Sequence, residues 1–411
     1  IPMKIGIVGA GAAGMIAAVA AAGAGADVFV VEHSSRPGMK LNITGKGRGN
    51  ITNNCDIPTL IKNVPGNGQF LYSAFNSFDP ADTMAFFEEL GVPLKTERGN
   101  RVFPVSDRAM DISAALLKRM KELGVRIVND KAREVTCRDG RVCGIAGHKG
   151  EYPCDRVILA CGGRSYPKTG SDGSGYRLAA MLGHTVTEPH PSLVPLAAKG
   201  SLPKRLEGLS LRNIAVTLSK NGKKIYNDFG EMVFTSYGVS GPVILSASAC
   251  IARSADFPYE LDIDLKPALD EGALDKRILR DFDENINRDF SNSLSKLLPA
   301  KLIPVIIELS GIPAEQKVHE ITRQQRLGLV RLIKCFGLEI VGTGPFDEAI
   351  VTSGGVSVKE ISPKTMGSKL VPGLYFAGEI IDVDGYTGGF NLQIAWSTGM
   401  KAGLSAAEED Y

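Results

Sequence analysis

The first 32 residues contain three apolar segments that differ in their periodicity. KIGIV (4–8) and ADVFVVE (26–32) are short runs rich in β-branched residues, which predicts two strands. MIAAVAAAGAG (15–25) is longer, rich in alanine and followed by glycine, which predicts a helix with a glycine at its end. Residues 5–26 carry no charge, as a membrane span or signal peptide would, but the six glycines there favour a βαβ unit.

Two further periodicities divide the middle of the chain. NIAVTLS, KKIYND, EMVFTS and YELDIDL alternate in polarity, with Asn221-Gly222 as a hairpin turn, so residues 192–266 are expected to form a β domain. Residues 267–337 repeat apolar positions with helical spacing, with Pro and Gly between the segments. We therefore predict an α/β fold in which a Rossmann-like domain, residues 1–191 and 338–411, is interrupted by this β domain and this helical segment.

Two stretches outside these insertions predict further parts of the Rossmann-like domain. Residues 126–163 read as short strands joined by turns at 138–141 and 148–150, then a buried strand that ends in Gly162 and Gly163. Residues 373–403 predict a strand over 374–377, the acids Glu379 and Asp382, and an apolar helix opened by Gly388-Gly389.

Composition narrows the class of protein. With 411 residues and 44% hydrophobic content, the chain suits a globular enzyme of two or three domains. Its 47 basic and 45 acidic residues form no basic run, so neither nucleic acid nor a membrane surface is expected as a partner. Seven cysteines without a CxxC pair argue against disulfides, a thiol redox couple or a zinc site, and favour the cytoplasm. HTVTEPH (184–190) is expected to be a loop, not a metal site.

GAGAAG (9–14) lies between the first predicted strand and the helix and has the form GxGxxG. In that motif Gly9 permits a tight turn, Gly11 lets the backbone approach a pyrophosphate, and Gly14 lets helix and strand touch. Glu32 ends the second strand, where a carboxylate accepts hydrogen bonds from ribose hydroxyls. A dinucleotide site is therefore expected, and the motif fits FAD and NAD equally well.

Later features favour FAD. A β-meander inserted into such a sheet is typical of flavoproteins, and the helix after Gly389 would direct its N–H groups at the O2 and N1 side of a flavin. The alternative is that the strand over 374–377 and the helix after Gly389 only close the sheet and bind no cofactor. Since the sequence has no second GxGxxG, NAD(P)H is expected only as a transient co-substrate bound against the flavin domain.

GKGRGN (45–50) alternates glycine with cations. It does not match GxxxxGK[ST], because position 40 is Lys and Gly47 follows Lys46, so ATP is not expected. Its glycines would allow close approach to a pyrophosphate or flavin, and Lys40, Lys46 or Arg48 would offset phosphate charge or bind an anionic substrate. The alternative is a solvated surface loop.

The chain resembles the YhiN/BaiN-like bacterial flavoproteins over almost its whole length. The motifs that carry the resemblance are GAGAAG with Glu32, MKLNITGKGRGNITN, PGNGQFLYSAF, TGSDGSGY, VTSGGVSVKEISPKTMGSK and GLYFAGEIIDVDGYTGGFNLQIAWSTG. The resemblance implies a glutathione-reductase-type FAD domain with inserted domains, and an NAD(P)/FAD-dependent oxidoreductase, aminoacetone oxidase or bile-acid-pathway reductase. Gly49 stands where the family usually has cysteine, so thiol or disulfide chemistry at that position is not expected.

Motifs and resemblance together give the predicted site. The cofactor-binding candidates are Gly9, Gly11, Ala12, Ala13, Gly14, Glu32, His33, Lys40, Gly45, Arg48, Gly49, Asn50, Ala132, Cys161, Gly162, Gly163, Gly378, Glu379, Asp382, Gly388, Gly389, Phe390, Asn391 and Leu392. The catalytic candidates are Tyr386 as a proton donor and Arg48 for a carboxylate or carbonyl, although each residue type is more often structural.

Three functions are compatible with these patterns. The leading hypothesis is a FAD-dependent oxidoreductase that passes hydride through a tightly bound flavin, between NAD(P)H or an organic donor and a small or steroid-like substrate. The alternatives are an amine oxidase of the aminoacetone type that needs no nicotinamide and produces hydrogen peroxide, and a non-catalytic flavin-binding redox sensor. A tRNA-modifying flavoenzyme is less favoured because no basic run is present.

Overall fold

The computed structural model describes residues 2–254 and 256–408, which divide into two compact units. The first unit comprises residues 1–193 and 345–411, and the second comprises residues 194–344. Each unit has its own hydrophobic core. The predicted boundaries at 192, 267 and 338 stay predictions about where separate domains begin.

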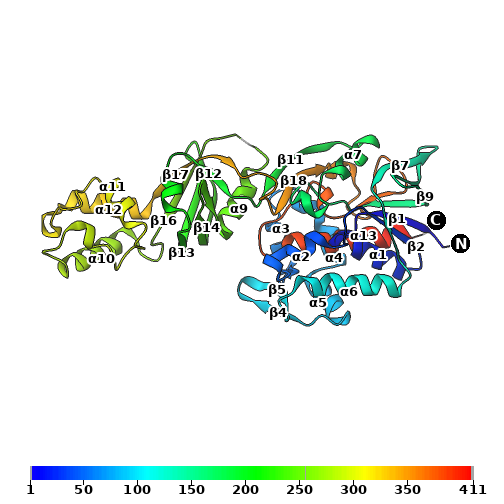
Figure 1. Ribbon diagram of the computed structural model, residues 1–411, viewed down its shortest axis with the longest axis horizontal. Helices are drawn as coiled ribbons and strands as arrows, with labels where there is room; N and C mark the ends of the chain where they lie inside the picture. Colours follow the sequence, from blue (N-terminus) through cyan, green and yellow to red (C-terminus); the bar gives the residue numbers. More distant parts are fainter. Residues whose placement is uncertain (1, 255, 409–411) are drawn as a thin grey trace. The chain divides into compact units, whose positions relative to one another are not determined.

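The first unit is built on a parallel five-stranded sheet (Figure 1). Its strand order is β19 (Leu374–Phe376), β10 (Arg156–Leu159), β1 (Lys4–Val8), β2 (Asp27–Glu32) and β6 (Arg126–Asn129). Almost every residue of β1, β2 and β10 is buried, as in sheets covered on both faces, which explains their continuous apolar runs. Helix α1 (Ala12–Gly23) connects β1 to β2, so the predicted βαβ unit is confirmed.

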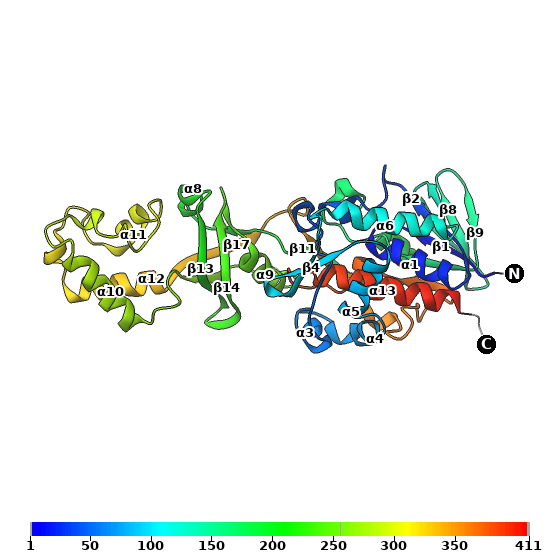
Figure 2. The same ribbon diagram turned by 90° about the horizontal axis from the view of Figure 1, so that it is seen from below.

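Three helices pack together on this sheet, namely α1, α6 (Ala109–Glu122) and α13 (Phe390–Ala407) (Figure 2). Small residues allow α1 and α13 to approach closely, since a Cβ on Gly399 would lie 2.5 Å from the carbonyl oxygen of Ala13. Both helices follow a parallel strand, so each begins at the carboxyl edge of the sheet, the edge where α/β proteins bind ligands.

Smaller elements surround this sheet. The meander of β7 (Ala132–Arg138), β8 (Arg141–Gly147) and β9 (Glu151–Pro153) has the predicted turns at 138–141 and 148–150. Two more sheets join β3 (Thr52–Asn53), β5 (Arg101–Pro104) and β4 (Leu94–Glu97), and β11 (Val186–Ser192) with β18 (Val351–Val356). The remaining helices of the unit are α2 (Met39–Ile43), α3 (Ile57–Lys62), α4 (Tyr72–Ser77), α5 (Pro80–Glu89) and α7 (Ser174–Met181). The expectation that 184–190 is a loop was wrong in part, because residues 186–192 form β11, in which Thr187 and His190 pair with Gly355 and Ser353 of β18.

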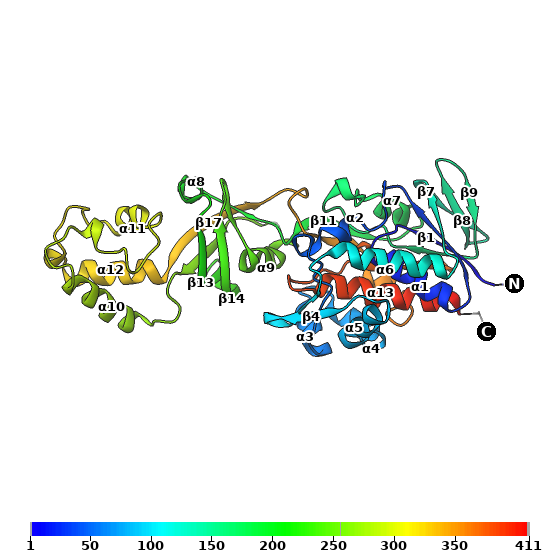
Figure 3. The same ribbon diagram turned by 60° about the horizontal axis from the view of Figure 1, so that its bottom comes forward.

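The second unit contains a closed antiparallel barrel and a group of helices (Figure 3). Around the barrel the order is β12 (Leu196–Ala198), β15 (Gly238–Ser240), β14 (Lys223–Phe234), β13 (Ser210–Lys220), β16 (Tyr259–Asp264) and β17 (Phe336–Thr343). The hairpin at Asn221-Gly222 is present, and β14 contains KKIYND together with the first four residues of EMVFTS. The helices are α8 (Leu202–Leu206), α9 (Pro242–Ile251), α10 (Glu271–Asp283), α11 (Ile303–Ser310) and α12 (Arg323–Lys334).

The predicted α/β architecture is confirmed. Over residues 2–254 and 256–408, none of the helices has both the length and the apolar character needed to cross a bilayer. The uncharged N-terminal stretch forms β1 and α1.

Candidate cofactor-binding site

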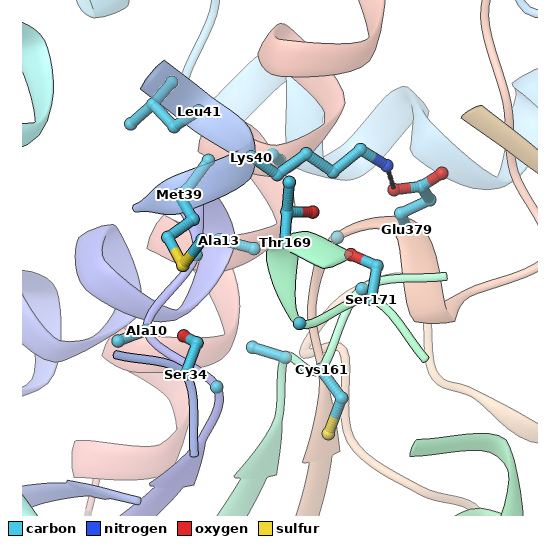
Figure 4. A pocket seen from close by; sticks show the side chains of 18 of the residues that line it. Ala10, Ala13, Ser34, Met39, Lys40, Leu41, Cys161, Thr169, Ser171 and Glu379 are labelled. Atoms are coloured by element: carbon cyan, nitrogen blue, oxygen red, sulfur yellow. Dashed lines mark hydrogen bonds and ion pairs between the residues drawn. The ribbon is translucent and has the colours of Figure 1, made fainter. Parts of the chain in front are cut away.

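A cavity of about 1280 Å³, including its part open to solvent, lies at the carboxyl edge of the parallel sheet (Figure 4). Its walls come from the segments after β1, β2, β6, β10 and β19, from α2 and from the start of α13. All of its lining residues belong to the first unit.

The three glycines of GAGAAG have three different surroundings. Gly9 has a φ of 101°, and a Cβ there would lie 2.5 Å from the carbonyl oxygen of Ala160. A Cβ on Gly14 would lie 1.8 Å from the carbonyl oxygen of Gly9. Gly11 differs, because a Cβ there would have no described heavy atom within 4 Å, although the residue lines the cavity. Gly9 and Gly14 thus fix the turn, while the space beside Gly11 fits a bound pyrophosphate.

The N-terminus of α1 faces this space. Gly11 precedes the helix and has no side chain that would cap it, and Ala12 and Ala13 follow on the cavity wall. The first N–H groups of a helix lack intrahelical partners and carry a partial positive charge, which suits an anion.

Glu32 is buried at the end of β2, with 8% of the residue exposed. One carboxylate oxygen accepts a hydrogen bond from the backbone N–H of Ala10 (2.6 Å), and the other accepts from the N–H of Ser34 (2.7 Å). These bonds hold the carboxylate beside the glycine turn, on the wall of the cavity. Carboxylate oxygens each have further lone pairs, so Glu32 is placed to accept from ribose hydroxyls.

An ion pair lies on another wall of the cavity (Figure 4). Nζ of Lys40 lies 2.6 Å from Glu379 and donates also to Ser165 (2.7 Å). The other oxygen of Glu379 accepts from the backbone N–H of Thr352 (2.7 Å). Lys40 therefore brings positive charge to the site from α2, far from the glycine turn in the sequence, and Glu379 fixes its position.

Polar side chains hold the start of α13 at the cavity. Gly389 precedes the helix at a φ of 100°, and a Cβ there would lie 2.3 Å from the carbonyl oxygen of Thr52. The Asn50 carboxamide, oriented to satisfy both of its ends, accepts from the N–H of Gly389 (3.0 Å). Asn53 donates to the carbonyl of Gly388 (3.0 Å). Asn391 and Leu392, in the first turn, line the cavity.

Cys161 lines the cavity without being reactive. Burial raises the pKa of its thiol to about 12, with a smaller contribution from Glu32. A thiol with that pKa is protonated at neutral pH and is a poor nucleophile.

The residues of GKGRGN are not among those that line this cavity. Gly45 and Gly49 have φ values of 57° and 78°, and a Cβ on Gly49 would lie 2.8 Å from Ile112 of α6. Arg48 stacks on Phe103, 4.1 Å from the ring centre, and pairs with Glu97 (2.5 Å) and Asp107 (2.6 Å). Its hydrogen bonds with these two carboxylates raise the pKa of Arg48. The glycines thus serve packing and chain reversal, and the anion-binding roles of Lys46 and Arg48 stay predictions.

The other predicted residues fall into two groups. Those that line the cavity are Gly9, Gly11, Ala12, Ala13, Glu32, His33, Lys40, Ala132, Cys161, Gly162, Gly378, Glu379, Asn391 and Leu392. The wall does not include Gly14, Gly45, Arg48, Gly49, Asn50, Gly163, Asp382, Tyr386, Gly388, Gly389 or Phe390. Tyr386 is half-buried, and its backbone N–H donates to the carbonyl of Asn63 (2.9 Å). Its catalytic role, like that of Arg48, stays a prediction.

Sequence reasoning missed several lining residues, including Ser34, Met39, Asp130, Lys131 and the segment 169–171. The sequence did indicate the segment 169–171, because it belongs to TGSDGSGY, a stretch rich in glycine and other small residues. Within 2–254 and 256–408, no cluster of three His, Cys, Asp or Glu side chains is arranged to hold a metal ion.

A family model described as the HI0933-like protein Rossmann domain matches residues 3–405. The chain belongs to this family. The predicted resemblance to bacterial flavoproteins is therefore confirmed, and the chain is a FAD-dependent oxidoreductase.

Two relatives match almost the full length of the chain. It is 35% identical over 411 residues to a 3-dehydro-bile acid delta(4,6)-reductase of Clostridium scindens, covering 98% of this chain and 99% of the relative. It is 31% identical over 408 residues to a ribosomal RNA dihydrouridine synthase of Haemophilus influenzae, covering 98% of each.

Solved structures show the same fold at low identity. The 3-ketosteroid-delta4-(5alpha)-dehydrogenase of Rhodococcus jostii RHA1 superposes with a TM-score of 0.55 at 17% identity, covering 99% of this chain and 97% of that one. A flavocytochrome c3 fumarate reductase gives 0.53 at 18%, covering 98% and 78%.

Proposed function

We propose that the protein is a FAD-dependent reductase that saturates a carbon–carbon double bond conjugated to a carbonyl group in a small or steroid-like substrate, with NAD(P)H as electron donor. The observation that carries this proposal is the full-length match, at 35% identity, to a 3-dehydro-bile acid delta(4,6)-reductase. The 3-dehydro group of that relative's substrate is a ketone, and the double bond at carbon 4 is conjugated to it.

Both relatives' names describe related chemistry. Dihydrouridine differs from uridine by the saturation of a double bond that is conjugated to a ring carbonyl. For a double bond directly conjugated to a carbonyl, the proposed reaction adds a hydride to the carbon β to the carbonyl and a proton to the α carbon. One NAD(P)H and one proton thus balance the reduction of one double bond.

The cavity residues fit FAD. The α1 N-terminus beside Gly11 would bind the pyrophosphate, and Glu32 would accept hydrogen bonds from the adenosine ribose. Lys40, paired with Glu379, would lie near the cofactor, and the N–H groups at the start of α13 would face the flavin ring. When bound, FAD supplies the transfer of two electrons between donor and acceptor.

NAD(P)H as donor and a cytoplasmic location remain parts of this proposal. The sequence contains no second GxGxxG, so the nicotinamide cofactor would bind transiently. The cytoplasmic location is proposed because the seven cysteines include no CxxC pair and suit a reducing compartment. Tyr386 is the proposed proton donor to the α carbon.

A second candidate function is the reduction of a uridine in ribosomal RNA. The relative from Haemophilus influenzae and a further relative from Escherichia coli, 27% identical over 403 residues, favour it. The charge balance of 47 basic against 45 acidic residues gives little support for binding a polyanion. The absence of nucleic acid among the partners therefore stays a prediction.

The experiment that tests these proposals is an anaerobic visible spectrum of the holoprotein, before and after NADH and then NADPH. We expect rapid bleaching of the flavin, followed by reoxidation on adding a 3-keto-Δ4 steroid. Reoxidation only by unmodified ribosomal RNA would favour the second candidate. A flavin that stays yellow with both nucleotides but bleaches with an amine, and forms peroxide in air, would instead identify the amine oxidase. A flavin that neither nucleotide nor amine reduces would favour a sensor.

A further inference from the structure

Residues 163–173 form a closed loop on the wall of the cavity. The backbone N–H of Gly173 donates to the carbonyl of Gly163 (3.2 Å), which joins the two ends. Turn hydrogen bonds lie inside the loop, for example from Thr169 to the carbonyl of Tyr166 (2.9 Å). A compact loop of this length with its ends together is an Ω-loop, a class that is often functional. Residues 163–173 are called the Ω-loop below.

The first half of the Ω-loop is attached by several bonds. The N–H groups of Arg164 and Ser165 donate to the Thr352 hydroxyl, at 2.8 and 3.1 Å. The Ser165 hydroxyl bonds Glu379 (3.1 Å) and accepts from Lys40 (2.7 Å). This half is therefore fixed to β18 and to the ion pair on the cavity wall.

The second half reaches the opposite side of the cavity. The cavity is lined here by Thr169, Gly170 and Ser171, and Figure 4 shows the side chains of Thr169 and Ser171. A Cβ on Gly170 would be 3.5 Å from Cβ of Ser34 and 3.7 Å from the ring of His33, the residues that follow Glu32. The loop thus covers the part of the cavity in which Glu32 would hold the adenosine ribose.

One ion pair attaches this second half to the segment after β6. Asp172 lies 2.8 Å from Nζ of Lys131. The two side chains are 32% and 40% exposed, so the pair is accessible to water and salt. Burial raises the pKa of Asp172, but hydrogen bonds from Lys131 and Ser174 lower it further, to about 2. The Asp172 carboxylate is therefore charged at neutral pH.

The partner side of this pair is rigid. Asp130, next to Lys131, is 3% exposed and accepts from the N–H groups of Lys131 (2.7 Å) and Lys149 (3.0 Å) and from the Tyr152 hydroxyl (2.8 Å). The backbone of Lys131 is therefore anchored to the meander, while Asp172 lies at the end of the Ω-loop and accepts from the N–H of Ser174, the first residue of α7 (2.9 Å).

We propose that the Lys131–Asp172 ion pair is a latch that holds the Ω-loop closed over the adenosine half of FAD and so controls how fast FAD enters and leaves. The inference rests on FAD as the occupant of the cavity, but not on the substrate. Since residues 169–171 line the part of the cavity beside Glu32, displacement of the loop would widen the opening through which FAD leaves. The latch is the contact that a displacement of the second half must break first.

Release of FAD from the holoprotein tests the latch. We expect Asp172→Asn and Lys131→Met each to raise the release rate constant about two- to fivefold at low salt, the range for exposed ion pairs. The asparagine keeps an acceptor for the N–H of Ser174, so the start of α7 is preserved. Because both variants break one contact, the double variant should release FAD no faster than either single variant. Release is followed by flavin fluorescence after dilution.

The control is Asp27→Asn, which removes the exposed Arg126–Asp27 pair (3.0 Å) between β2 and β6, away from the cavity wall. It should leave the release rate unchanged. Unchanged release in both single variants, or additive effects in the double variant, would overturn the latch.

A second readout needs no cofactor. Lys168 is exposed at the loop tip, so limited digestion with trypsin should cut after it faster in FAD-free Asp172→Asn than in the FAD-free wild type, and FAD should slow both. Equal rates in the FAD-free proteins would contradict the latch. A wild-type protein that never binds FAD would instead refute the cofactor assignment on which the latch depends.

Discussion

Glu32 shows how one buried carboxylate connects sequence to cofactor. It satisfies the N–H groups of Ala10 and Ser34, so it organises both the glycine turn and the segment after β2. Glu32→Ala leaves the N–H groups of Ala10 and Ser34 without their acceptor and removes the acceptor for the ribose hydroxyls. Since each hydrogen bond to a charged group is worth about 1.5–3 kcal/mol, the dissociation constant for FAD should rise about 10- to 100-fold.

Titration of the FAD-free protein with FAD measures this effect. Glu134→Gln is the matched control, because that acid is exposed on β7 and lies outside the cavity wall. A dissociation constant that Glu32→Ala leaves within twofold of the wild type would show that the carboxylate does not bind the cofactor.

His184 predicts a dependence of stability on pH. Its side chain is fully buried against Phe376, with Nε2 2.8 Å from Ser368 and Nδ1 3.2 Å from Glu360. Burial lowers the pKa of His184 below 6.5, although Glu360 opposes the shift. The unfolded chain then binds more protons just below pH 6.5, so the free energy of unfolding should fall as the pH drops through and below that value.

Urea unfolding at pH 7.5 and 5.5 measures the slope. His184→Gln should reduce the difference between the two pH values, whereas His148→Gln, at an exposed position, should keep it. Glu360 also has a lowered pKa, through its bonds with Thr185 and His184, but it affects stability only at more acidic pH, below about 4.3. An identical slope in His184→Gln and the wild type would refute the prediction.

At the scale of elements, the contact of α1 with α13 opposes helix propensity. Alanine is favoured over glycine inside a helix by about 1 kcal/mol. At Gly399 of α13, however, a Cβ would lie 2.5 Å from the carbonyl oxygen of Ala13 and 2.6 Å from Ile16. Overpacking costs about 1–3 kcal/mol and here involves backbone, so steric repulsion should win and Gly399→Ala should lower the free energy of unfolding.

Gly328 in α12 is the matched control. A Cβ there has no described heavy atom within 4 Å, so Gly328→Ala should stabilise its unit by up to about 1 kcal/mol. Unfolding curves give the free energy of unfolding of both variants and so test this prediction. Stabilisation by Gly399→Ala would mean that α1 and α13 are free to separate.

Elements with local signals could be predicted from the sequence, and contacts between distant segments could not. The turn at Gly9, the helix after it and Glu32 lie within one βαβ unit, whose pattern is contained in 30 residues. The surroundings of the loop at 45–50 could not be predicted, because Gly49 lies against Ile112 and Arg48 pairs with Glu97 and Asp107, partners that no local spacing reveals.

At the scale of the whole molecule, the cavity and the inserted unit are separate parts of the chain. Every residue that lines the cavity belongs to residues 1–193 or 345–411, while the barrel and α10–α12 have a core of their own. A ligand stabilises the part of a protein that binds it, by about 2.7 kcal/mol at a concentration 100 times its dissociation constant. Saturating FAD should therefore slow amide hydrogen exchange mainly in the first unit, most strongly in α1, the segment after β2 and the Ω-loop.

Exchange measured by mass spectrometry with and without FAD tests this distribution. Peptides from α10 to α12 serve as internal controls, because these helices pack within the second unit and contribute nothing to the cavity wall. Protection confined to the first unit would leave the barrel and its helices as the part available to recognise the substrate, because the cofactor needs only the first. Equal protection of barrel and α1 peptides would mean that FAD binding orders both units together, and the substrate would then have to be sought at a site that the cofactor itself completes.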